Sequence, residues 1–255
     1  MIFNKIKVRA MVKLVTIICG VFLSVSCTRN SSETNESGNV VIPQEDVIDD
    51  SFLSQELQAR LTPDTILTIL KARNKEYIED NLTVRNTSAR IRKASLGQYP
   101  AAVVLSCLDS RVPVEDVFHS GIGDLFVARV AGNISNEDIL GSLEYACKVS
   151  KAKLVVVLGH EHCGAIKSAI DDVKLGNITA LLSKIRPAIG NLNTFTGERS
   201  AKNPAFMEAV TKENVQQTIR NIRSSSPILK QMEDAGEIKI IGAEYHMGTG
   251  TVEFL

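Results

Sequence analysis

Two short segments of the sequence combine side chains that bind metal ions or move protons. Cys107, Asp109 and Arg111 directly follow one apolar run, while His160 and Cys163 follow another. The last two are three positions apart where a strand is expected to lead into a helix, a spacing that lets both side chains point the same way. Two sulfurs and one nitrogen suit Zn²⁺ in tetrahedral coordination, and three protein ligands leave the fourth position for a reactive water. The residue types therefore predict a catalytic zinc site.

The elements that position these side chains are predicted by apolar runs that alternate with helix-period segments. The apolar runs lie at 101–106, 125–130 and 153–158, and helix-period segments follow at 136–148 and 165–173. Continuous apolar runs are typical of strands that are buried on both faces of a sheet. Strands and helices in this order imply right-handed crossovers and a mostly parallel sheet.

The rest of the chain adds helices and a last strand. Helices are predicted at 63–81, 178–189 and 205–232, a strand at 237–246 and a closing hairpin at 251–255. The expected fold class is α/β, with a central mostly parallel β-sheet, flanking helices, an N-terminal helical arm outside the sheet and a C-terminal strand or hairpin. Ligands of such sheets bind at the carboxyl ends of the strands. The zinc ligands meet there if the first and third strands are neighbours.

Cysteine chemistry leaves a second interpretation open. In an exported protein, Cys107 and Cys163 are also candidates for a disulfide bond. A His-x-x-Cys segment taken alone is better explained by a buried cysteine beside a loop histidine. Cys147 lies on a helix-like pattern, where a buried structural thiol is expected.

The two motifs together resemble a known signature. Cys-x-Asp-x-Arg after one strand and His-x-x-Cys after another, some fifty residues later, are similar to the zinc motifs of the β-class carbonic anhydrases. Further segments that resemble the family lie at 110–113, 126–133, 141–146, 158–165, 242–245 and 252–254. The resemblance covers roughly residues 60–255.

The resemblance implies a role for each residue. Cys107, His160 and Cys163 hold one Zn²⁺ per chain, and Asp109 with Arg111 forms a catalytic dyad that orients a zinc-bound hydroxide toward CO₂. The reaction is the reversible hydration of CO₂ to bicarbonate and a proton. Gly164, at the start of the next helix, is placed to offer its backbone N–H to a substrate oxygen, although packing alone also explains a glycine there. A homodimer or homotetramer is expected, with the helix from Pro63 as the arm that reaches the partner.

Two other functions keep the same site. Relatives of this fold act as zinc hydrolases on CS₂ or COS, and pocket differences too small to see in one sequence decide the substrate. An exported zinc or thiol protein without catalysis is the second alternative.

The N-terminus has the pattern of an export signal. A basic segment precedes the short apolar run 14–23, and small residues lead to Cys27, which resembles the acylated cysteine of a bacterial lipoprotein. Residues 1–27 are therefore expected to be a signal peptide, 28–55 a disordered tether and 56–255 the enzyme domain. The mature protein is predicted to lie on the periplasmic or cell-surface side, attached to a membrane by its lipid only; a soluble periplasmic protein is the alternative.

Composition excludes one class of partner. Lys and Arg number 29, Asp and Glu also number 29, and Trp is absent. A chain without net charge and with few aromatic side chains has little with which to bind phosphates or stack on bases, so nucleic-acid binding is not expected.

Overall fold

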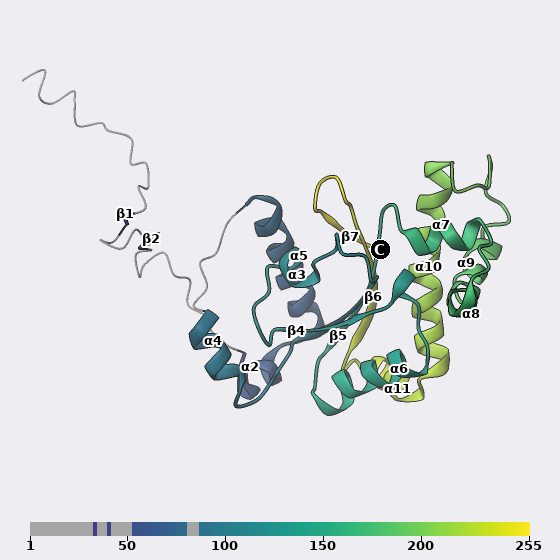
Figure 1. Cartoon of the computed structure of the whole chain (residues 1–255). Coiled ribbons are helices and arrows are strands. Elements are labelled where there is room, and N and C mark those ends of the chain that lie inside the picture. The colour runs from purple at the N-terminus through teal and green to yellow at the C-terminus, as the bar shows by residue number, and fades with distance from the viewer. Residues whose placement is uncertain (1–32, 35–39, 42–52, 81–86) are drawn as a thin grey trace, which may run out of the picture. The chain divides into compact units, whose positions relative to one another are not determined.

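The computed structural model describes residues 33–34, 40–41, 53–80 and 87–255 (Figure 1). The chain divides into two compact units, Met1–Asp46 and Val47–Leu255. In the first unit, the described residues form two short antiparallel strands, β1 (Glu33–Thr34) and β2 (Val40–Val41). The predicted signal peptide, with Cys27, and most of the predicted tether lie outside the described residues.

A five-stranded sheet forms the centre of the second unit, in the order β4-β3-β5-β6-β7. Its strands are β3 (Ala102–Ser106), β4 (Leu125–Arg129), β5 (Leu154–His160), β6 (Lys239–Tyr245) and β7 (Val252–Phe254). All neighbouring pairs are parallel except β6 and β7, which are antiparallel. The predicted strands and the mostly parallel sheet are thus confirmed, and the first and third predicted strands, β3 and β5, are neighbours.

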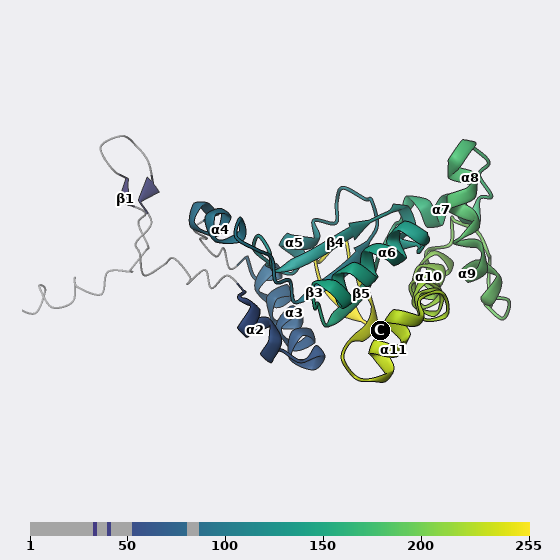
Figure 2. The same cartoon turned by 90° about the horizontal axis from the view of Figure 1, so that it is seen from below.

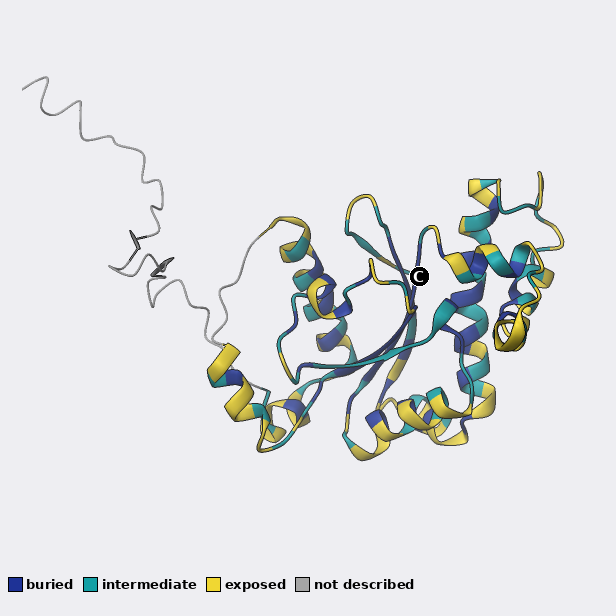
Figure 3. Cartoon of the chain, in the orientation of Figure 1, coloured by how far each residue is buried: buried dark blue, intermediate teal, exposed yellow. Residues whose placement is uncertain are grey.

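Helices cover both faces of this sheet (Figures 1 and 2). On one face, α3 (Pro63–Ile78) and α5 (Val114–Val117) pack against alternate residues of β3 and β5. The other face is covered by α6 (Glu137–Glu144), α10 (Pro204–Ser225) and α11 (Pro227–Asp234). Every residue of β3 and β5 is buried, and Figure 3 shows the buried residues gathered in the strands and on the inner helix faces. This double burial explains why both strands are continuous apolar runs.

A third apolar cluster joins the carboxyl edge of the sheet to a group of short helices. These are α7 (Gly164–Ile170), α8 (Gly176–Ser183) and α9 (Arg186–Asn191), and they pack together with part of α10 around Cys107 and Cys163. The helix predicted at 178–189 is therefore divided between α8 and α9.

The long helix predicted at 205–232 is also two helices. Ser226 ends α10 and begins α11, and its side chain accepts a hydrogen bond from the Leu229 N–H. The break follows from Pro227, because a proline disfavours helical geometry in the residue before it and is well tolerated at the first helical position.

Some of the helical structure was not anticipated from the sequence. The helix predicted at 136–148 ends its α-helical part at Glu144 and continues as a π-helical turn, Tyr145–Val149. Two short helices, α2 (Gln55–Arg60) and α4 (Thr87–Ala94), were not predicted because they are too short to show a helical repeat of apolar residues. Among the described residues, no helix combines the length and the apolar character needed to cross a membrane.

Candidate metal centre

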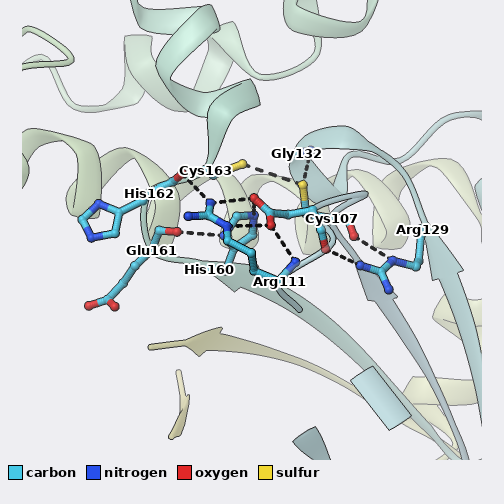
Figure 4. A network of polar contacts seen from close by, with 9 residues as sticks. Cys107, Arg111, Arg129, Gly132, His160, Glu161, His162 and Cys163 are labelled. Atoms are coloured by element: carbon cyan, nitrogen blue, oxygen red, sulfur yellow. Dashed lines mark hydrogen bonds and ion pairs between the residues drawn. The ribbon is translucent and has the colours of Figure 1, made fainter. Parts of the chain in front are cut away.

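The three predicted zinc ligands meet at the carboxyl edge of the sheet (Figure 4). Cys107 directly follows β3, His160 is the last residue of β5, and Cys163 is the N-cap of α7. All three are buried, and their ligand atoms lie within 4.8 Å of one another. Because β3 and β5 are parallel neighbours, their carboxyl ends lie at the same edge, which brings together side chains that are far apart in sequence.

The spacing of the two sulfurs fits a shared metal ion. Cys107 Sγ and Cys163 Sγ are 3.9 Å apart. Zn–S bonds of about 2.3 Å in a tetrahedral site place two sulfurs roughly 3.8 Å from each other, whereas a disulfide requires about 2.05 Å. The described cysteines, Cys107, Cys147 and Cys163, are all free thiols. The predicted disulfide alternative is therefore absent from the structure, and Cys147 is buried in the core as expected.

His160 presents an unpaired nitrogen to the sulfurs. Its Nδ1–H donates to the backbone carbonyl of Glu161 at 2.8 Å, which leaves Nε2 with the lone pair. This Nε2 is fully buried and has no hydrogen-bond partner. A buried polar atom without a partner costs free energy, so such atoms are rare unless another group completes them. A metal ion is the group that fits, since a backbone hydrogen bond on the opposite ring nitrogen is how proteins orient ligating histidines.

The surroundings of the two thiols favour ionisation of Cys107. The Gly132 N–H donates to Cys107 Sγ at 3.3 Å. The hydrogen bond with Cys163 lowers the pKa of Cys107, and the same interaction raises the pKa of Cys163. Ionisation of one sulfur therefore opposes ionisation of the other. A divalent cation between them would allow both to ionise.

Asp109 and Arg111 form the predicted pair beside this centre. Arg111 Nε donates to Asp109 Oδ1 at 2.9 Å and Arg111 Nη2 donates to Oδ2 at 2.7 Å, while the Arg111 backbone N–H also reaches Oδ1 at 2.9 Å. These bonds to Arg111 hold the pKa of Asp109 well below its usual range, so the carboxyl is ionised. Asp109 Oδ2 lies 4.0 Å from His160 Nε2. The carboxylate thus faces the metal centre while both of its oxygens are engaged by the arginine.

Two residues that were not predicted as site residues hold the backbone around Cys107, one at its own segment and one at the Gly132 loop that donates to its sulfur. From β4, Arg129 donates to the backbone carbonyl of Cys107 at 3.0 Å and to that of Asp109. From α10, the Asn214 side-chain amide donates to the Gly132 carbonyl at 2.8 Å. Arg129 lies in a segment that resembles the family, which was a usable signal. Asn214 sits in the middle of a long helix with no motif around it, so only the fold reveals its contact.

Gly164 is the first residue of α7, directly after the predicted ligand Cys163. A Cβ added at Gly164 would meet no heavy atom within 4 Å. Packing therefore does not require a glycine at this position, which removes the structural explanation considered for it. Its role toward a substrate stays a prediction.

Comparisons with known proteins agree on one family. Residues 102–252 match the family model described as carbonic anhydrase. A carbonic anhydrase of Mycolicibacterium smegmatis is 37% identical over 169 residues, which span 64% of this chain and 79% of that protein. Carbonic anhydrase 2 of Mycobacterium tuberculosis is 31% identical, over 60% of this chain and 73% of that protein.

Solved structures share the fold. A β-carbonic anhydrase of Coccomyxa, in complex with acetazolamide, superposes with a TM-score of 0.58 at 27% identity, over 80% of this chain and 86% of that one. One of two β-carbonic anhydrases of Sordaria macrospora, both described as tetrameric, gives a TM-score of 0.59 at 23% identity, over 75% of this chain and 97% of that one. The sheet and helices described above are those of this class of structure.

Proposed function

Since this chain belongs to the carbonic anhydrase family and shares the fold of its β class, we propose that it binds one Zn²⁺ through Cys107, His160 and Cys163. Its activity is the reversible hydration of CO₂ to bicarbonate and a proton. The observation that carries the metal assignment is the buried, unpartnered Nε2 of His160 beside two thiols at the separation that zinc requires.

The residues around the centre have different roles in the hydration of CO₂. A bound zinc ion supplies the Lewis acid that makes water nucleophilic near neutral pH. Asp109, ionised and facing the centre, accepts a hydrogen bond from the attacking hydroxyl and so fixes the direction of its lone pair toward the carbon of CO₂. Arg111 fixes the carboxylate through a bidentate pair, which gives geometric precision as well as charge. The N–H of Gly164 is the proposed donor to a substrate oxygen.

The test of this proposal is a pair of cysteine variants. Cys163→Ala should lose both zinc and CO₂ hydration, measured as metal content and stopped-flow rate on the same sample. Cys147→Ala is the matched control, because Cys147 is a buried thiol in the core away from the metal centre. Full zinc content in Cys163→Ala, or loss of zinc in Cys147→Ala, would contradict the ligand assignment.

We also propose that the protein is exported and held at a membrane by acylation of Cys27, on the periplasmic or cell-surface side. The support is the sequence pattern of a basic segment, a short apolar run and small residues before a cysteine. Residues 28–55 then act as the tether. Cys27→Ser should abolish incorporation of a labelled fatty acid and release the protein from membranes; unchanged labelling would refute acylation at this residue.

An assembly of two or four copies is the last part of the proposal. Supporting it is a hollow of about 650 Å³ between β4 and α6, lined by Val103, Phe126, Ile139 and Tyr145 among others. Tyr145 is 53% exposed at this hollow, where a partner chain would cover it. Light scattering of the purified enzyme domain gives the mass directly, and a monomer at micromolar concentration would exclude the assembly.

A further inference from the structure

A second group of metal-binding side chains lies at the junction of β6 and β7. Glu244 on β6 and Glu253 on β7 are directly opposite each other in the antiparallel register, and His246 follows two residues after Glu244. One ligand atom from each of the three lies within 4.8 Å of the others. Two carboxylates directly opposite on neighbouring strands repel each other, so this arrangement requires a positive charge nearby.

Glu244 is the residue that points to a ligand. Its side chain is fully buried, and neither of its carboxylate oxygens has a hydrogen-bond partner. Burial raises the pKa of this carboxyl. A buried carboxylate without hydrogen bonds is among the costliest groups in a folded protein unless a cation completes it.

Lys212 on α10 does not complete it. Its Nζ lies 3.0 Å from Glu253 Oε2 and 3.1 Å from Glu208 Oε1 but 3.7 Å from Glu244 Oε2, which is beyond hydrogen-bond distance. A single ammonium group thus serves three carboxylates and bonds only the two outer ones. Its side chain is 33% exposed, so it is able to turn outward to Glu208.

His246 is oriented as a ligand. Its Nδ1 lies 3.0 Å from Glu161 Oε1, and since the backbone N–H of Met247 donates to the other oxygen of Glu161 at 2.8 Å, that carboxylate is fixed in place. The neighbouring carboxylates, Glu161 foremost, also raise the pKa of His246, so a metal ion at Nε2 would take the place of a proton there. A carboxylate behind a histidine is the usual outer support of a metal ligand.

The separation of the donors has the size of a metal site. His246 Nε2 and Glu253 Oε2 are 3.5 Å apart. Bonds of about 2.0–2.2 Å to tetrahedral Zn²⁺ separate neighbouring N and O donors by roughly 3.3–3.6 Å. A protonated His246 forms an ion pair with Glu253 at this distance, and a metal ion would replace that proton between the same two atoms.

We propose that Glu244, His246 and Glu253 form a second metal site, which binds a divalent transition-metal ion of the Zn²⁺ type through one nitrogen and two carboxylates. The site is independent of the thiolate centre in its ligands. It is joined to that centre by Glu161, whose side chain supports His246 and whose backbone carbonyl accepts from the ligand His160. Binding the ion displaces Lys212 toward Glu208, so the metal and the ammonium group compete.

The experiment measures zinc per chain at equilibrium with buffered free zinc, using the protein loaded at its thiolate centre. Wild-type protein should take up a second equivalent. His246→Gln and Glu253→Gln should each weaken that second binding at least tenfold, whereas Lys212→Met should strengthen it at least tenfold because the competing charge is gone. His119→Gln, which changes a histidine paired with Glu76 on α3, is the control and should bind as the wild type does.

Each outcome bears on the proposal. A wild-type protein that stays at one zinc up to millimolar free metal would overturn it, as would a second equivalent that His246→Gln and Glu253→Gln leave unchanged. The first equivalent is assigned separately by its loss in Cys163→Ala. Failure of the thiolate centre and failure of the second site are therefore distinguishable in the same titration.

Discussion

Replacing Gly132 by alanine should destabilise the protein by about 2–5 kcal/mol, a sum of two effects at one carbon atom. Gly132 has a φ of +71°, a left-handed conformation that costs an L-residue about 1–2 kcal/mol. A Cβ there would lie 2.7 Å from Ile185 Cδ1, which is buried, and overpacking of this kind costs about 1–3 kcal/mol. For a chain of this size the loss corresponds to a melting temperature lower by roughly 4–20 °C.

The Gly132→Ala substitution should also weaken zinc binding. The Gly132 N–H donates to Cys107 Sγ, so a shifted backbone at residue 132 weakens a hydrogen bond to a ligand sulfur. We expect zinc affinity to fall by about 10–100-fold, as for other supports of metal ligands. The assays are urea unfolding of the zinc-loaded protein and zinc competition with a chromophoric chelator.

Two further variants isolate the causes. Gly141→Ala is the matched control, because a Cβ at this helical position meets nothing within 4 Å and φ is ordinary; it should be neutral or stabilise by up to about 1 kcal/mol. In Gly132→Ala with Ile185→Val, removal of the clashing Cδ1 should make the combined loss smaller than the sum of the single losses. Strictly additive losses, or a Gly132→Ala protein as stable as the wild type, would refute the reasoning.

Three other predictions concern the residues around the metal centre. Asp109→Asn should keep its zinc but lose about 10²–10⁴-fold in CO₂ hydration rate, because it removes the carboxylate that orients the nucleophile; full turnover at normal zinc content would exclude that role. Arg129→Met should lower the free energy of unfolding by about 1–3 kcal/mol, since it leaves the carbonyls of Cys107 and Asp109 without their donor, and urea unfolding with no change would show that water replaces it. Arg111 lowers the pKa of Asp109 in the folded state. The pair therefore contributes its full stabilisation above the unfolded-state pKa of about 3.9. That contribution is lost only as the pH falls through the lower folded-state pKa. The carboxyl ¹³C shift of Asp109 should therefore stay constant from neutral pH down to about pH 4, and a titration midpoint above that value would contradict the pairing.

The clustering of the predicted metal ligands could be foreseen because its signals are local. Cys107, Asp109 and Arg111 lie within five residues, and His160 and Cys163 within four, each group directly after an apolar strand. Buried parallel strands can be recognised in a sequence as continuous apolar runs. Ligands that follow such strands are expected to lie together at the carboxyl edge of the sheet. The adjacency of β3 and β5 was the one condition left open, and the sheet order meets it.

The remaining features depend on contacts between distant segments, which a single sequence does not display. Asn214 reads as an ordinary helix residue until α10 is packed against the Gly132 loop. Glu244 and Glu253 lie in segments that resemble the family, but nothing local relates them to each other until the antiparallel register of β6 and β7 sets the two carboxylates opposite each other. The division of α10 from α11 was a different kind of miss, since Ser226 and Pro227 carried a local signal that the apolar periodicity on either side obscured.

The parallel pairing of β3 with β5 also sets the order of events during maturation. A hairpin forms from contiguous residues, but a parallel pair closes only after the whole crossover between its strands has been synthesised and folded. Before that, a nascent chain offers His160 and Cys163 as an incomplete two-donor site and Cys107 as an isolated thiol. The three ligand atoms of the candidate metal centre therefore come together only once β3 and β5 have paired, so its capacity to bind a metal depends on the completed sheet.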